Sequence, residues 1–137
     1  MKRLLMACAF LVSAIAVPVF AHHSMTGFDR AKTVNLVGTI KGFGWVNPHS
    51  WIEMEVPDGK GGATTWNVEM TAPGILAKAG WKSTTIKAGD KVTVAVHPLL
   101  TGEPGGLFVS VTLADGKVMM ERNPPPAAPA APAAAKP

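Results

Sequence analysis

The sequence predicts an all-β domain with one short helix, arranged as an OB-like, partly open five-stranded barrel. Three observations favour this fold. Segments rich in β-branched residues alternate with glycine- and proline-containing turns, a glycine interrupts the first such segment, and a short helical segment separates the third strand from the fourth. A small β-sandwich of the same strands is the alternative, because the order of strands does not determine whether a sheet closes.

The first three strands are expected at residues 33–43, 50–56 and 63–70, where β-branched residues are frequent. Gly38 lies inside the first segment, and a glycine within a strand usually marks a bulge or a sharp bend. Residues 57–62 (PDGKGG) read as a turn that joins the second and third strands in a hairpin. Along the second strand the two faces alternate, with Trp51, Glu53 and Glu55 on one and Ile52, Met54 and Val56 on the other.

A short helix is expected at residues 73–79 (PGILAKA). Thr71 is the predicted N-cap, because a threonine side chain can accept a hydrogen bond from the first free backbone N–H groups of a helix. Pro73 suits the first turn, where its missing N–H costs nothing, and Gly80 is expected to end the helix. The segment is therefore a brief connection between strands rather than a second layer of the fold.

The last two main strands are expected at residues 91–97 and 107–113, separated by a loop that contains three glycines and two prolines. Residues 116–120 are a candidate extension of the same sheet. Met54 and Met70 are expected to pack in the core, since their spacing matches the inward positions of strands and methionine fills core gaps well.

Residues 1–21 have the three parts of a bacterial Sec signal peptide. Lys2 and Arg3 form the positive region, an apolar stretch follows, and small residues precede a cut after Ala21. The apolar stretch is shorter than the roughly 20 residues of a membrane-spanning helix, so we expect removal and export to the periplasm rather than anchoring. Removal also takes away Cys8, the one cysteine, and with it thiolate metal sites and disulfides.

Residues 22–122 then form a single OB-like domain of the commonest size. Residues 123–137 are proline and alanine apart from one asparagine and one lysine, and we expect them to form an extended tail. The mature chain keeps 11 basic and 9 acidic residues, a net charge of +2, without a run of lysine or arginine. Nucleic-acid binding is not expected, because it calls for a basic stripe.

All four histidines survive removal of the signal, and imidazole suits copper and other divalent transition metals. His22 becomes the first residue, so its amine and its imidazole can bind one metal ion together. His49, which follows a proline in the loop after the first strand, is the preferred third ligand. His97, at the end of the fourth strand, could replace it, and His23 is a further candidate. The hypothesis is a small periplasmic protein that binds copper or another divalent metal.

Trp51 and Trp66 lie on the second and third predicted strands, whose outer face binds oligosaccharides and oligonucleotides in OB barrels. The alternative hypothesis is therefore a module without a metal that binds a carbohydrate, a cell-wall fragment or a protein. Stacking needs an exposed indole, whereas tryptophans in a small barrel are more often buried. Core packing of these tryptophans is therefore the favoured expectation.

No Ser-His-Asp spacing, phosphate-binding loop or HExxH motif is present in the sequence. The glutamates at positions 53, 55 and 69 are typical of the solvated face of an antiparallel sheet. We therefore assign no catalytic residue and expect a protein that is not an enzyme.

The His22-His23-Ser24 start, Asn47-Pro48-His49 and Gly80-Trp81 together resemble a family of small exported bacterial proteins of unknown function. They span nearly the whole predicted domain and end before the proline/alanine tail. The resemblance implies an exported single domain and carries no established activity or catalytic role. The more specific of these motifs are Asn47-Pro48-His49 and Gly80-Trp81.

Overall fold

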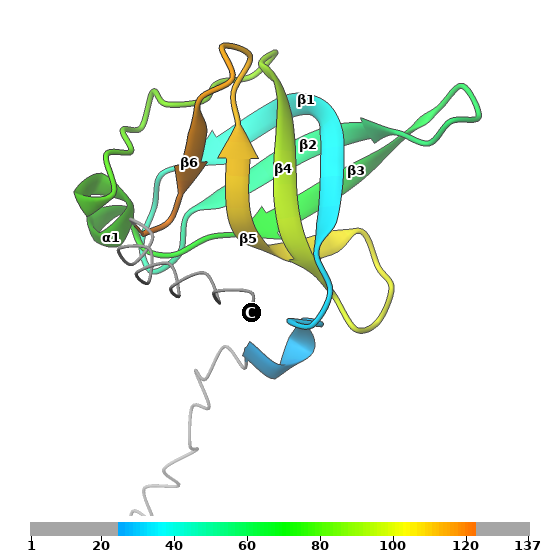
Figure 1. The fold of residues 1–137 in the computed structure, drawn as a ribbon, viewed down its shortest axis with the longest axis horizontal. Coiled ribbons are helices and arrows are strands. Elements are labelled where there is room, and N and C mark those ends of the chain that lie inside the picture. Colours follow the sequence, from blue (N-terminus) through cyan, green and yellow to red (C-terminus); the bar gives the residue numbers. More distant parts are fainter. Residues whose placement is uncertain (1–24, 123–137) are drawn as a thin grey trace, which may run out of the picture.

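The structure is a computed structural model, and it describes residues 25–122. The predicted signal peptide, residues 1–21, and the predicted tail, residues 123–137, lie outside the described residues. The elements in chain order are η1 (Met25–Gly27), β1 (Val34–Gly44), β2 (Trp51–Pro57), β3 (Ala63–Glu69), α1 (Pro73–Lys78), β4 (Lys91–Pro98), β5 (Gly105–Thr112) and β6 (Val118–Met120) (Figure 1).

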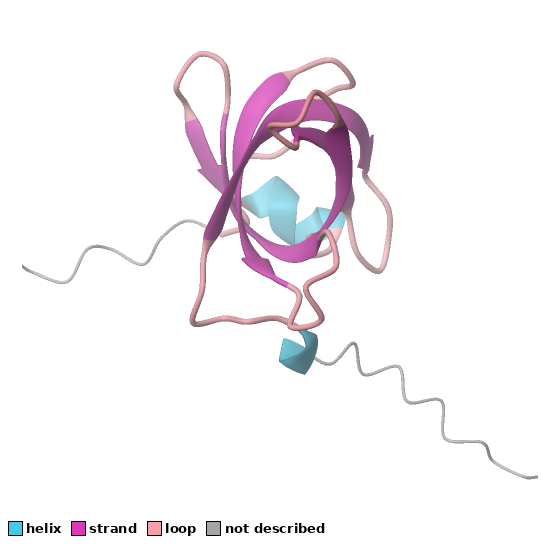
Figure 2. Cartoon of the chain, turned by 90° about the vertical axis from the view of Figure 1, so that its right-hand side faces the viewer, coloured by secondary structure: helices cyan, strands magenta, loops and turns pink. Residues whose placement is uncertain are grey.

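Five of the strands form a closed ring, so the predicted OB-like barrel is confirmed rather than the sandwich. Hydrogen-bonded neighbours follow the order β3-β2-β1-β4-β5. The ring closes where β3 runs parallel to β5, with Asn67 opposite Gly105 and Glu69 opposite Leu107. Figure 2 looks along the barrel and shows the strands surrounding its interior. β6 pairs with the later residues of β5, Ser110 to Thr112, and lies outside the ring.

Strand β1 is long and bent, which lets it pair with β2 at one end and with β4 at the other. Thr39 is opposite both Glu55 of β2 and Lys91 of β4. The register shifts between Ile40 and Gly42, so the bulge lies one residue beyond Ile40 and not at Gly38 as expected. Gly38 has a different role, because a Cβ there would overlap the backbone carbonyl oxygen of Glu55.

The core fills the barrel and continues under α1, which lies across one end (Figures 1 and 2). Leu76 of α1 and Trp81 after it are almost fully buried. The indole Nε1–H of Trp81 donates to the carbonyl oxygen of Met120 at 2.8 Å, which ties the segment after α1 to β6. Met54 and Met70 are 0% and 2% exposed, so both pack in the core as predicted.

The start of α1 differs from the prediction. Ala72 is the N-cap, and its side chain makes no capping bond. Thr71 instead extends the pairing beyond β3, because its carbonyl oxygen accepts a hydrogen bond from the N–H of Ser50 at 3.1 Å. Its own N–H donates to Oε1 of Glu121 at 2.7 Å. The helix ends at Lys78 with Ala79 as its C-cap, and Gly80, which was expected to end it, follows with a φ of +89° that favours glycine.

Candidate functional site

A cleft of about 700 Å³ lies on the outer face of β2 and β3. Its walls are the loop between β1 and β2 and the loop between β4 and β5, the two loops that border the ligand face of OB barrels. The volume is within the range of small-molecule sites. The lining residues are Phe28, Val46, Asn47, Pro48, His49, Ser50, Trp51, Asn67, Val68, Glu69, Leu99, Glu103, Pro104, Gly105 and Gly106.

The floor of the cleft follows from the register of β2 and β3. Trp51 is opposite Glu69, and Glu53 is opposite Asn67. Residues directly opposite in an antiparallel pair share a face. Their chain neighbours Ile52 and Val68 are buried, so Trp51, Glu69 and Asn67 point away from the core.

Trp51 is 43% exposed on this outer face, so the expectation that it packs in the core is wrong. A Cβ at Gly44 would overlap its indole ring, and one at Gly42 would lie 3.2 Å from its Cζ3 atom. The indole therefore rests against the backbone of β1, where two glycines leave space for it. The ring is held in place by its own strand and its neighbour, which makes it a preformed apolar surface.

Trp66 lies on the opposite face from Trp51, which corrects the expectation that one face carries both. Trp66 is opposite Met54, which is fully buried, and it packs against the core cluster. Glu69 is opposite Trp51 and shares its face, and Trp66 precedes Glu69 by three positions. Because side chains alternate along a strand, Trp66 points to the other face. Trp66 is not among the residues that line the cleft.

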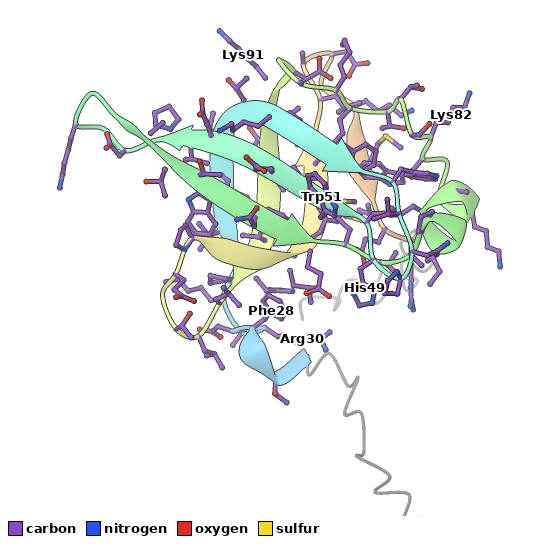
Figure 3. The ribbon with its side chains drawn as sticks, turned by 180° about the vertical axis from the view of Figure 1, so that it is seen from behind. Phe28, Arg30, His49, Trp51, Lys82 and Lys91 are labelled. Atoms are coloured by element: carbon purple, nitrogen blue, oxygen red, sulfur yellow. The ribbon has the colours of Figure 1, made fainter. Side chains whose placement is uncertain are left out.

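His49 lies beside Glu69 at the edge of the cleft, and Figure 3 labels His49, Trp51 and Phe28 on this side of the barrel. The Nδ1 atom of His49 is 2.6 Å from Oε1 of Glu69. Both side chains are about one third exposed. The sequence identified His49 as a candidate but indicated only an ordinary solvated glutamate at Glu69. The missing information was the register, in which Trp51, two residues after His49, is opposite Glu69.

Glu121, just after β6, adds a second carboxylate to this neighbourhood. Burial raises its pKa, and the negative charge of Glu69 acts in the same direction. The N–H of Thr71 and the nearby Arg122 and His49 lower the pKa of this carboxyl, with a smaller combined effect than burial and Glu69. His49 therefore sits in a setting with two carboxylates.

His97 has a different environment. Its strand neighbour Val96 is fully buried, so His97 points outward from β4. Its Nδ1 atom is 2.8 Å from the backbone carbonyl oxygen of Lys32, which can only accept a hydrogen bond. His97 does not line the cleft, so the structure does not bring it together with His49 there.

His22 and His23 lie outside the described residues, but the chain that follows them is anchored at the cleft. Phe28 forms a β-bridge with Leu99 and lines the cleft. The N–H of Asp29 donates to the carbonyl oxygen of Pro98 at 2.8 Å, and the N–H of Leu100 donates to that of Gly27 at 3.0 Å. Residues 27–29 are thus held against the loop between β4 and β5.

Residues 25–122 contain no group of three or more histidine, cysteine, aspartate or glutamate side chains placed to hold a metal ion. They also contain no helix with the length and apolar character needed to cross a membrane.

One family model matches this chain, over residues 9–109, and its description is a family of unknown function, DUF6152. No curated protein matches the chain, and no solved structure does.

Proposed function

The chain belongs to the DUF6152 family, a family of unknown function, and we propose that this member is a small copper-binding protein of the bacterial cell envelope. In this proposal Cu(II) is bound by the amine and imidazole of His22, exposed after removal of the signal peptide, and by the imidazole of His49. The observation that carries it is that Phe28 and His49 line the same cleft.

The length of the chain supports this arrangement. His22 precedes Phe28 by six residues in the sequence. Residues 25–27 form η1, so at most the three steps from His22 to Met25 can be extended, a reach of about 10 Å. Because Phe28 is bridged to Leu99 on one wall of the cleft that His49 also lines, this reach can bring His22 toward His49. His23 adjoins His22 and is the secondary candidate for a further ligand.

The charge of the cleft also favours a cation. Its ionisable lining residues are His49, Glu69 and Glu103, with no lysine or arginine among them. The carboxylates of Glu69 and Glu103 make the binding of Cu(II) electrostatically more favourable. The same charge opposes binding of an anion such as a nucleic acid.

Replacing His49 tests the site against a matched histidine. In the mature protein that starts at His22, His49→Ala is expected to weaken Cu(II) binding at least about tenfold, because one of three nitrogen ligands is lost. His97→Ala is the control and is expected to leave the affinity unchanged, since His97 bonds to the carbonyl oxygen of Lys32 outside the cleft. Titration against a competing chelator measures both.

The proposal is wrong if the two variants lose affinity equally, or if neither differs from the wild type. Thermal unfolding of each variant without copper separates loss of a ligand from loss of the fold.

The exposure of Trp51 favours a second candidate function, the binding of an uncharged saccharide in the same cleft. Its preformed indole surface can stack on a sugar ring, and Asn67, Glu69 and Glu103 can bond to hydroxyl groups. Trp66 takes no part, because it packs against the core.

We expect a change of tryptophan emission when N-acetylglucosamine oligomers are added, and no such change in Trp51→Phe. An unchanged spectrum of the wild type across neutral oligosaccharides would exclude this candidate.

A further inference from the structure

We propose that Glu69 is a positioning residue, which holds the ring of His49 in the tautomer with a proton on Nδ1 and thereby makes Nε2 its metal-binding nitrogen. The inference deepens the copper site and rests on the proposed function for its metal-binding part. Its structural part concerns only described residues and stands on the 2.6 Å separation between Nδ1 of His49 and Oε1 of Glu69.

Glu69 is presented by a firmly held part of the sheet. It is opposite Trp51 of β2 on one side and Leu107 of β5 on the other, at the point where the barrel closes. A residue paired on both sides has little freedom to shift its Cα atom. The carboxylate therefore starts from a defined position at the end of β3.

The backbone beside His49 is held equally well. The N–H of Ser50 donates to the carbonyl oxygen of Thr71 at 3.1 Å, and the carbonyl oxygen of Ser50 accepts from the N–H of Met70 at 2.9 Å. The residue after the histidine thus continues the β2–β3 pairing by one step. His49 and Glu69 are brought together by two segments of one hairpin.

The chemistry of the pair determines the tautomer. A carboxylate has no proton to donate, so the ring nitrogen beside it must be the donor. With the proton on Nδ1, the lone pair of the neutral ring is on Nε2. Metal-binding histidines commonly have this arrangement, in which a carboxylate on one ring nitrogen orients the other and increases its basicity. Glu121 interacts electrostatically with both members of the pair, and the positive charge of Arg122 acts on Glu121 in turn.

The tautomer can be measured without copper, by two-bond proton–nitrogen correlation spectra of the ¹⁵N-labelled mature protein at pH 8. We expect His49 of the wild type to give the pattern of a neutral ring protonated at Nδ1. Glu69→Ala is expected to shift the ring toward the Nε2-protonated form, which is the commoner form in water. Glu69→Gln, whose amide oxygen can still accept from Nδ1, is expected to restore much of the wild-type pattern. Glu53→Ala is the matched control, because Glu53 lies on the same face but pairs with Lys41.

The copper measurement then separates the two proposals. Glu69→Ala is expected to weaken Cu(II) binding about tenfold, the lower end of the usual effect of such carboxylates, with Glu69→Gln in between and Glu53→Ala unchanged. If Glu69→Ala leaves both the tautomer and the affinity as they were while His49→Ala loses copper, this inference is wrong and the copper site stands. If the tautomer shifts as expected but His49→Ala binds copper normally, the copper site is wrong and the orienting role of Glu69 stands.

Discussion

Acetylation of the amine of His22 is expected to weaken Cu(II) binding about 100-fold or more, even though every side chain remains present. The reason is chelation: once the amine and the imidazole of one residue bind together, the second bond forms intramolecularly, and such linkage increases affinity by about 10² to 10⁴. Acetylation turns the amine of His22 into an amide, so the imidazole of His22 loses the partner that binds the same ion with it.

The comparison needs two preparations that both start at His22, one with a free amine and the other acetylated there. Chelator competition gives the affinities, and electron paramagnetic resonance reports the nitrogen ligands of Cu(II). A methionine added before His22 is not an equivalent block, because it makes His23 the third residue, and a free amine with a third-residue histidine binds Cu(II) strongly by itself. Equal affinities of the two preparations would contradict a role for the amine.

Gly38→Ala is expected to destabilise the domain by about 3 kcal/mol, at the upper end of the usual cost of overpacking. A Cβ at this position would overlap the carbonyl oxygen of Glu55, which is backbone and cannot turn away like a side chain. The nearest side-chain atom, Cε of Met54, would be only 3.1 Å away and belongs to a fully buried residue. The overlap could be removed only if β1 and β2 moved apart near the point where β1 changes its pairing from β4 to β2.

Chemical denaturation with urea, followed by circular dichroism, measures this effect. Gly27→Ala is the matched control, because a Cβ there has nothing within 4 Å and its φ is not in the left-handed region. Gly42→Ala should have a smaller effect than Gly38→Ala, since its nearest neighbour is the partly exposed ring of Trp51. A free energy of unfolding for Gly38→Ala equal to that of Gly27→Ala would show that β1 and β2 tolerate the separation.

The candidate site was only partly predictable from the sequence. His49 was predictable as a loop residue because a histidine after Asn47-Pro48 in a connection between strands is a local feature. Trp51 was predictable as an outward residue because strand alternation is also local. Glu69 was not assigned to the site, since its contact with His49 spans 20 positions of the chain and depends on the register of β2 and β3.

The expectation for Trp66 failed for the same reason. The two tryptophans lie on separate strands, and whether they share a face depends on which residues of β2 and β3 are opposite each other. The observed register puts Trp66 opposite the buried Met54 and Trp51 opposite Glu69. A shift of that register by one residue would have exchanged the faces of a whole strand.

The sequence by itself determined the order of the elements, the alternation of their faces and the turns between them, because each of these depends on neighbouring residues. The strands, the short helix and the buried methionines follow from such local patterns. Only the tertiary structure decided that β3 meets β5 to close the barrel, that glycines of β1 receive the indole of Trp51, and that Glu69 contacts His49. These contacts depend on register and on the bend of β1, which many residues far apart in the chain set together.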